Sequence, residues 1–368
     1  MPESRLHRLS ALGQSVWIDF LSRDLLRSGE LVRMMEENAV CGVTSNPTIF
    51  QKALSQGSAY DAQVRDELDE EDDPKEIFVR LAARDVGDAC DLMRSVWDGG
   101  AGLRGYVSIE VDPHLAYETE TTYDEAKRLH ALIDRPNLYV KIPGTKPGLP
   151  AIEDMIAAGK SINVTLIFSL QRHREVMEAY VRGLERLVAA GGDPRPVSSV
   201  ASFFVSRVDT ETDKRLDEIG GRHELKGKLA VANAKLAYRN WKEVFSGERW
   251  EFLASKGASA QWCLWASTST KNPAYSDVLY VDSLIGPETV NTMPEETISA
   301  FQNHGDVALT LEQGIDDAKR LFEQLAAAGV DYDDVTETLE EEGVQKFADS
   351  FDELVNSLRE LTRERVAS

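Results

Sequence analysis

The chain has 368 residues, of which 42% are hydrophobic, and it carries a formal net charge of −22 at pH 7. Its length suits one large domain or two average ones, and its composition is that of a folded globular protein rather than a disordered one. Such an acidic balance argues against nucleic acid or an anionic membrane as a partner, because both are bound through basic patches.

The N-terminal segment and the cysteines indicate the compartment. The first residues, MPESRLHRLSALG, lack the apolar run of a signal peptide, and no stretch of about 18 apolar residues occurs in the sequence. Cys41, Cys90 and Cys263 are widely spaced and form no CxxC pair, which favours a reducing compartment over a disulfide framework or a zinc site. Neither GxGxxG nor GxxxxGK[ST] is present. We therefore expect a soluble cytoplasmic protein that uses no cofactor.

Short apolar runs alternate with longer helical patterns along the chain. The apolar runs are 15–20, 41–47, 105–113, 137–144, 161–169, 197–209, 260–270 and 288–294. The clearest helical patterns between them are 28–37, 123–134, 148–159, 170–192 and 224–246. We interpret the acidic stretch 66–74 as a loop. Eight strand–helix units predict a (β/α)₈ TIM barrel with additional helices, and an open doubly wound sheet is the structural alternative.

The last stretch, 341–366, has a different pattern. One apolar stripe, with a residue every three or four positions, is formed by Val344, Phe347, Phe351, Leu354, Leu358 and Leu361. We interpret 333–368 as a C-terminal helical extension packed on the barrel, within a single domain that spans 1–368. A dimer interface is the alternative interpretation of the stripe, so we expect a monomer or a homodimer.

Polar residues interrupt the predicted strands near their carboxyl ends, where barrel enzymes keep their chemistry. In the run 137–144, alternation places Lys141 on one face and Leu138, Val140 and Ile142 on the other. If the aliphatic face packs under helices, Lys141 points into the barrel. Polar side chains also stand at other predicted strand ends, namely Asp19, Asn46, Glu110, Asn163 and Thr165.

Each of these residues also has a structural interpretation. A strand lysine can protect a sheet edge, and Glu110 can simply orient a neighbour. Asn46 can belong to a turn before a proline, whereas Asn163 and Thr165 can satisfy each other. Together, however, an amine beside carboxylates indicates Schiff-base chemistry, because only a neutral amine attacks a carbonyl group. Burial of a lysine lowers its pKa from about 10.4, and a carboxylate such as Glu110 would then shuttle protons during carbinolamine dehydration.

Five motifs, in order along the chain, resemble those of the transaldolase family in its long bacterial form. They are GVTSNPTIF, NLYVKIPGT, SINVTLIFS, ASFFVSRVD and YVDSLIGPETVNTMPEETI, and the resemblance covers nearly the whole chain. It implies a cofactor-independent enzyme of the non-oxidative pentose phosphate pathway. Such an enzyme moves a dihydroxyacetone unit from sedoheptulose 7-phosphate to glyceraldehyde 3-phosphate, giving erythrose 4-phosphate and fructose 6-phosphate. The alternatives are an aldolase-like cleavage of fructose 6-phosphate and a non-catalytic protein that binds sugar phosphates.

The resemblance also implies catalytic roles. Lys141 is the Schiff-base nucleophile, and Glu110 is the proton shuttle, with Thr165 helping to hold its water. Asp19 accepts the C4-hydroxyl proton as the carbon–carbon bond breaks. The dihydroxyacetone unit would contact Asn46, Asn163, Ser202 and Phe204.

The phosphate group should lie against Arg207 and the loop that begins at the end of WCLWAS, residues 262–267. In that loop Ser267 matches the family's serine, but Ser269 stands where the family's best-known pattern has an arginine. We expect Lys271 to supply the missing charge as a point cation, without the bidentate fork of arginine. A solvated loop lysine is the alternative interpretation of Lys271.

Overall fold

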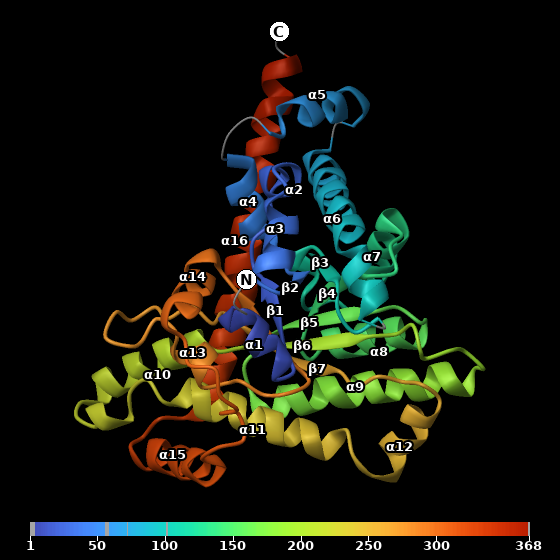
Figure 1. Ribbon diagram of the computed structural model, residues 1–368. Helices are drawn as coiled ribbons and strands as arrows, with labels where there is room; N and C mark the ends of the chain where they lie inside the picture. The colour runs from blue at the N-terminus through green and yellow to red at the C-terminus, as the bar shows by residue number, and fades with distance from the viewer. Residues whose placement is uncertain (1–3, 56–58, 72, 101, 367–368) are drawn as a thin grey trace.

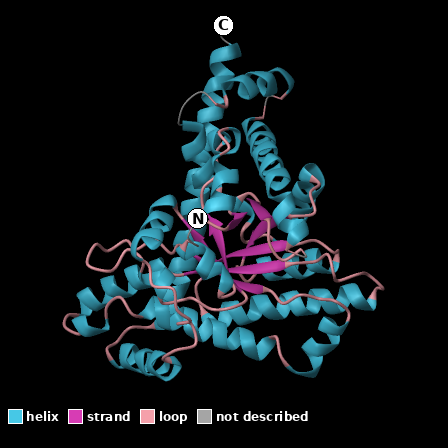
Figure 2. Ribbon diagram, in the orientation of Figure 1, coloured by secondary structure: helices cyan, strands magenta, loops and turns pink. Residues whose placement is uncertain are grey.

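Eight parallel strands form a closed barrel in the order β1-β2-β3-β4-β5-β6-β7-β8, and β1 pairs with β8. The strands lie near the centre of the molecule with helices around them (Figure 2, magenta and cyan). The computed structural model describes residues 4–55, 59–71, 73–100 and 102–366, without the side chains of 55, 69–70 and 361–366. The strands are β1 (Gln14–Ile18), β2 (Val40–Val43), β3 (Tyr106–Glu110), β4 (Leu138–Pro143), β5 (Ile162–Ile167), β6 (Ser199–Phe204), β7 (Trp262–Ala266) and β8 (Thr289–Met293). The predicted TIM barrel is confirmed, and each strand lies in or beside one of the predicted apolar runs.

Helices surround the barrel and connect its strands (Figure 1). Up to β5 they are α1 (Arg5–Ala11), α2 (Arg23–Arg27), α3 (Glu30–Glu37), α4 (Pro47–Ser55), α5 (Asp61–Glu70), α6 (Pro74–Gly99), α7 (Thr119–Ile133) and α8 (Gly148–Ala157). After β5 they are α9 (Leu170–Ala189), α10 (Ser206–Ile219), α11 (Leu229–Val244), α12 (Gly247–Ser255), α13 (Leu279–Asp282), α14 (Glu295–His304), α15 (Ile315–Ala327) and α16 (Tyr332–Val366). Two 3₁₀ helices complete the set, η1 (Pro113–Leu115) and η2 (His223–Leu225).

The predicted loop at 66–74 is wrong in its first half, because α5 continues to Glu70. Arg80 on α6 forms ion pairs with Glu67 and Glu71, at 3.2 and 3.3 Å, and so offsets part of the negative charge. The next helix begins at Pro74, where the Asp73 side chain accepts a hydrogen bond from a backbone amide of the first turn.

Aromatic side chains close the barrel below the layer that contains Lys141. Trp17, Tyr106 and Tyr139 are each only 1% exposed. The rings of Tyr106 and Tyr139 stack with centroids 4.0 Å apart, and those of Trp17 and Tyr139 with centroids 6.1 Å apart. Gly42 on β2 makes room for this floor, because a Cβ atom there would come within 2.3 Å of the Trp17 ring.

The long helix α16 lies across the carboxyl ends of the strands, where it contacts β5, η1, α4, α6 and α10 (Figure 1, red). Its apolar stripe is buried at Val344, Phe347, Phe351, Leu354 and Leu358, and the side chain of Leu361 lies outside the described residues. The stripe is therefore covered within one chain. None of the described helices has the length and apolar character needed to cross a membrane.

Gly343 lets α16 approach the barrel closely. A Cβ atom at this position would lie 3.0 Å from Cδ2 of Leu166 and 3.6 Å from Nη1 of Arg207. A glycine inside a helix costs roughly 1 kcal/mol relative to alanine, so its presence here fits a requirement for close packing. The helix thus covers one side of the barrel mouth.

Candidate active site

The lysine predicted to point into the barrel lies at the centre of the mouth. Strand register places Glu110, Lys141 and Asn163 side by side on β3, β4 and β5. Lys141 Nζ donates hydrogen bonds to Glu110 Oε2 at 3.0 Å and to the Ser45 carbonyl oxygen at 3.1 Å. The two charged side chains are only 6% and 2% exposed. From above, the ring centroid of Phe347 on α16 lies 5.8 Å from Nζ, so the amine is enclosed by protein.

Burial and the neighbouring amine act in opposite directions on Glu110. Burial raises the pKa of Glu110, and the charge and hydrogen bond of Lys141 oppose that rise. The net pKa lies above the usual value, so this carboxyl group is suited to holding a proton. Lys141 and Glu110 are in direct contact, and the predicted role of a water between the reacting group and Glu110 stays a prediction.

Two polar atoms beside this pair have no hydrogen-bond partner among the described residues. They are Oε1 of Glu110 and Oγ1 of Thr165, and both are buried. A buried polar atom without a partner costs free energy, so most such atoms in proteins bind a ligand or an ordered water. Because Thr165 follows Asn163 by two residues on β5, its side chain lies on the same face of the strand. Both atoms are thus available to a substrate or a water.

Asn163 is held on both sides of its amide group. Its Nδ2 donates to Ser108 Oγ at 3.1 Å, and its Oδ1 accepts a hydrogen bond from Ser202 Oγ at 2.7 Å. The alternative in which Asn163 and Thr165 satisfy each other is therefore wrong. The pairing fixes the orientation of the amide and brings Ser202 on β6 into the same layer as Lys141.

Asn46 follows β2 and also begins a helix. Its Oδ1 accepts a hydrogen bond from the Ile49 backbone amide at 3.0 Å, as an N-cap does for α4. The turn interpretation of Asn46 thus applies to the oxygen of its amide. The amide nitrogen remains free to donate to a substrate hydroxyl.

Asp19 directly follows β1 and lies in a mixed electrostatic environment. Burial raises the pKa of Asp19 to about 6, and the negative charge of Glu296 adds to the rise. Lys271 and Lys52 act in the opposite direction. These effects place Asp19 near both cations and near the first turn of α14. A carboxylate that titrates near neutral pH is suited to accepting a proton.

The expected phosphate-binding residues come together where β6 and β7 end. Ser206 and Ser267 join the two segments through contacts of 2.9 Å between their Oγ atoms and 3.0 Å between the Ser206 amide and the Ser267 carbonyl oxygen. Ser267 has a φ of +56°, an uncommon conformation for a residue with a side chain and one that concentrates at functional sites. Next to Ser206, the Arg207 guanidinium carbon lies 5.1 Å from the centroid of the Phe204 ring.

The cations of this region have few partners of their own. Burial lowers the pKa of Arg207, and among the described residues no carboxylate lies within 4.0 Å of its guanidinium. Lys271 Nζ lies 2.5 Å from Ser269 Oγ, the residue that stands where an arginine was expected. Both side chains are therefore available to an anionic ligand.

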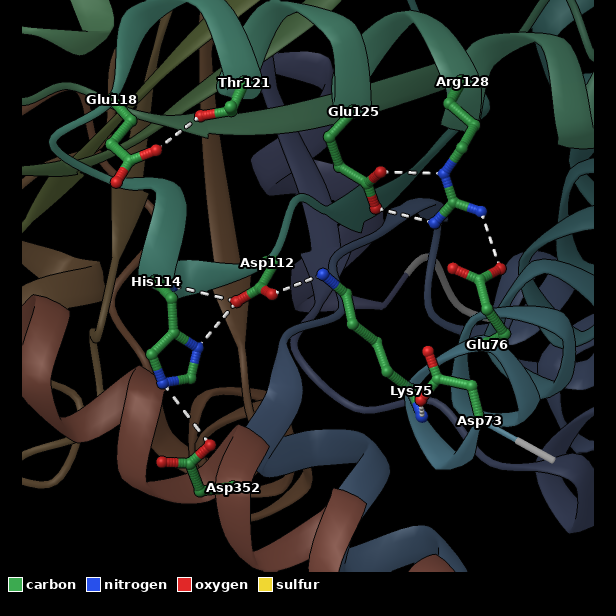
Figure 3. Close-up of polar contacts among 10 residues, drawn as sticks. All are labelled: Asp73, Lys75, Glu76, Asp112, His114, Glu118, Thr121, Glu125, Arg128 and Asp352. Atoms are coloured by element: carbon green, nitrogen blue, oxygen red, sulfur yellow. Dashed lines mark hydrogen bonds and ion pairs between the residues drawn. The ribbon is translucent and has the colours of Figure 1, made fainter.

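A polar network holds the segment that follows β3 (Figure 3). Asp112 accepts contacts from Lys75 Nζ at 2.7 Å and from His114 Nδ1 at 2.8 Å. On its other side, His114 Nε2 lies 3.4 Å from Asp352 on α16. The network connects the end of the strand that carries Glu110 to the helix over the mouth.

Several residues of the site were not predicted from the sequence. The Ser45 carbonyl and Ser108 contact the catalytic layer through atoms that carry no sequence signal of their own. Phe347 and Glu296 come from α16 and α14, which the sequence shows only as helical or motif-bearing segments. Within the described residues, no three His, Cys, Asp or Glu side chains are grouped in a way that could hold a metal ion.

The chain is similar to known proteins over nearly its whole length. The family model described as transaldolase/fructose-6-phosphate aldolase matches residues 16–358. A transaldolase of Mycobacterium tuberculosis is 52% identical over 358 residues, which cover 96% of each chain. A transaldolase of Frankia alni is 51% identical over 356 residues, again 96% of each chain. A transaldolase of Acidothermus cellulolyticus is 51% identical over 366 residues, or 98% of each chain.

Proposed function

The chain belongs to the transaldolase/fructose-6-phosphate aldolase family, and from this premise we propose how its site performs the transaldolase reaction. In that reaction a dihydroxyacetone unit passes from sedoheptulose 7-phosphate to glyceraldehyde 3-phosphate, which yields erythrose 4-phosphate and fructose 6-phosphate. The similar proteins are named transaldolase and match this chain over nearly its whole length, which favours transfer over simple cleavage and over non-catalytic binding. The observation that carries the mechanism is the enclosed pair of Lys141 and Glu110.

Schiff-base formation begins with a proton transfer within this pair. Moving one proton from Nζ to Oε2 across 3.0 Å leaves a neutral amine and a neutral carboxylic acid. The raised pKa of Glu110 favours that state, because burial disfavours its charged form. The amine of Lys141 attacks C2 of the ketose, and one proton of its nitrogen passes to the carbonyl oxygen to give the carbinolamine. Glu110 then gives its proton to this hydroxyl group, which leaves as water and so forms the iminium. Thr165 orients the water through its free hydroxyl group.

Cleavage of the carbon–carbon bond follows from the iminium group. Asp19 accepts the proton of the C4 hydroxyl, the C4 oxygen forms the carbonyl of the departing aldose, and the electrons of the C3–C4 bond move onto the iminium. The dihydroxyacetone unit then remains on Lys141 as an enamine. Attack of this enamine on the aldehyde carbon of glyceraldehyde 3-phosphate reverses the sequence, and hydrolysis of the new imine releases fructose 6-phosphate.

The remaining site residues bind the parts of the substrate that do not react. Asn163 and Ser202, held by each other, meet the hydroxyl groups of the dihydroxyacetone unit, together with the amide nitrogen of Asn46. Phe204 lines the same space. At the other end of the substrate, the phosphate group lies against Arg207, Ser267 and Lys271.

Borohydride trapping tests this mechanism. The protein is reduced with borohydride in the presence of fructose 6-phosphate, and its peptides are examined by mass spectrometry. We expect a stable dihydroxyacetone adduct on Lys141, and no adduct in a sample that lacks the sugar. Lys271 serves as an internal control, because it lies in the same site but outside the enclosed pair. Failure to trap an adduct on protein that turns over would contradict the Schiff base.

We also propose the compartment, the domain organisation and the number of subunits of the enzyme. The three cysteines are buried and free, which fits work in the reducing cytoplasm. We propose that the chain is one TIM-barrel domain, 1–368, in which 333–368 is a C-terminal extension. The burial of the α16 stripe within one chain supports a monomer, and a homodimer through another surface is the alternative.

A further inference from the structure

A lysine of the C-terminal helix reaches the phosphate side of the mouth. Lys346 lies one helical turn after Gly343, where a Cβ atom would lie 3.6 Å from Nη1 of Arg207, so this face of α16 is turned toward Arg207. The positive charge of Arg207 is the largest cause that lowers the pKa of Lys346. Desolvation and the positive charges of Lys271 and Lys52 lower it further. Four cations from α10, α4, α16 and the loop after β7 therefore share one region.

The four cations repel one another, although Asp19 lies near Lys271 and Lys52 and Glu342 acts on Arg207. The chain has 63 acidic and 41 basic residues, so cations could be paired easily if pairing were their only role. Yet the described residues provide no ion pair or hydrogen bond for the Lys346 ammonium. Glu342, one turn earlier on α16, raises the pKa of Arg207 but lies more than 4.0 Å from either cationic group. Like charges held together in this way bind an anion favourably.

We propose that Lys346 binds the phosphate group of the sugar substrate together with Arg207 and Lys271. The C-terminal helix would thereby complete the phosphate site, at the place where Ser269 has taken the position of an arginine. A sugar phosphate carries about −1.5 to −2 charges at neutral pH, which one arginine and one point cation offset only in part. The proposal rests on the proposed function, because it takes the anion to be the phosphate of the donor or acceptor sugar.

A solvated lysine on an exposed helix face is the rival interpretation. Acceptors with and without a phosphate group distinguish the two interpretations. The phosphate group does not react, so its contacts are made equally in the ground state and the transition state. Loss of such a contact raises KM for phosphorylated substrates and leaves kcat nearly constant. A general disturbance of α16 would also affect an acceptor that has no phosphate group.

The test compares Lys346→Gln with Arg359→Gln. Arg359→Gln removes the same charge from the same helix, but Arg359 lies 13 residues from Lys346, about 20 Å along the helix axis. KM and kcat are measured for glyceraldehyde 3-phosphate and for unphosphorylated glyceraldehyde, with saturating sedoheptulose 7-phosphate as donor. Inhibition by inorganic phosphate is measured in parallel.

For Lys346→Gln we expect KM for glyceraldehyde 3-phosphate and the inhibition constant of phosphate to rise about five- to tenfold, with kcat within about twofold. KM for unphosphorylated glyceraldehyde should not change, Lys346→Arg should restore most of the affinity, and Arg359→Gln should behave as the native protein.

Two results would overturn the proposal. One is a Lys346→Gln variant with native KM and phosphate inhibition, while Arg207→Gln shows raised values. The other is an equal rise of KM for both acceptors, which would indicate a structural effect of α16. Failure of the proposed function is a separate result, because native protein would then give no borohydride adduct on Lys141.

Discussion

Replacing Glu296 with glutamine should move the acid limb of the pH–rate profile to lower pH. Burial raises the pKa of Asp19 to about 6, and the charge of Glu296 contributes to that rise. If Asp19 must be ionised to accept a proton, kcat/KM falls as the pH drops through this value, and only about a tenth of the groups stay ionised at pH 5. Removal of a like charge favours the ionised form, so the midpoint should fall.

The size of the shift follows from the position of the two carboxylates at a partly solvated mouth. Two like charges in such a setting repel each other by about 0.7 kcal/mol, which corresponds to roughly half a pKa unit. Lys271 acts on Asp19 with the opposite sign, so Lys271→Gln should raise the midpoint by a similar amount. Glu295 lies on the same exposed turn but is not among the charges that shift Asp19, which makes Glu295→Gln the matched control.

The assay is kcat/KM between about pH 5 and 8 at constant ionic strength, since salt screens exposed charges. A sugar phosphate itself titrates with a pKa near 6, so the absolute midpoint combines the enzyme and the substrate. The difference between variants on one substrate removes the contribution of the substrate. If the profiles of Glu296→Gln and Glu295→Gln coincide, the acid limb does not report Asp19 and the reasoning is refuted.

Four further substitutions test other parts of the structure. Lys141→Ala should abolish both turnover and the borohydride adduct, and retained activity would contradict the Schiff base. Arg207→Gln should raise KM for phosphorylated substrates roughly ten- to hundredfold with little change in kcat, whereas an unchanged KM would move the phosphate site elsewhere. Burial lowers the pKa of His114, but its two aspartate partners raise it to a net value above normal. His114 therefore stabilises the fold fully below about pH 6.5 and loses this effect as the pH rises through the raised value. His114→Gln should thus lower Tm at pH 6 by the equivalent of less than about 1 kcal/mol and less still at pH 8.5, and an equal loss at both pH values would exclude the ion pairs as its cause. Phe351→Ala should lower the free energy of unfolding by about 3 kcal/mol in chemical denaturation, and a loss below about 1 kcal/mol would contradict the packing of α16.

Local periodicity was sufficient to predict the barrel and the inward direction of its polar residues. Alternation along a strand fixes which side chains share a face, and the carboxyl ends of parallel strands in a closed barrel all meet at one mouth. Glu110 and Lys141 were therefore predicted on neighbouring strand ends, and the register places them directly opposite each other. Their hydrogen bond adds the distance that the pattern could not give.

The sequence pattern could not predict how distant segments pack together. The stripe from Val344 to Leu358 predicts an amphipathic helix, but it does not state which surface the helix covers. The position of Phe347 over Lys141 depends on the close approach allowed at Gly343, and that approach depends on Leu166 on β5. Similarly, the partners of Asn163 follow from the register of three strands.

The aromatic floor of the barrel determines how an enamine on Lys141 can be lost. Trp17, Tyr106 and Tyr139 are stacked and almost fully buried, so they cover the amine on the side of the amino ends of the strands. An enamine that waits for its second aldehyde is therefore exposed to premature protonation mainly from the mouth. The ratio of sugar transferred to free dihydroxyacetone released is therefore decided at the mouth, in the competition between acceptor and solvent for the space beneath α16.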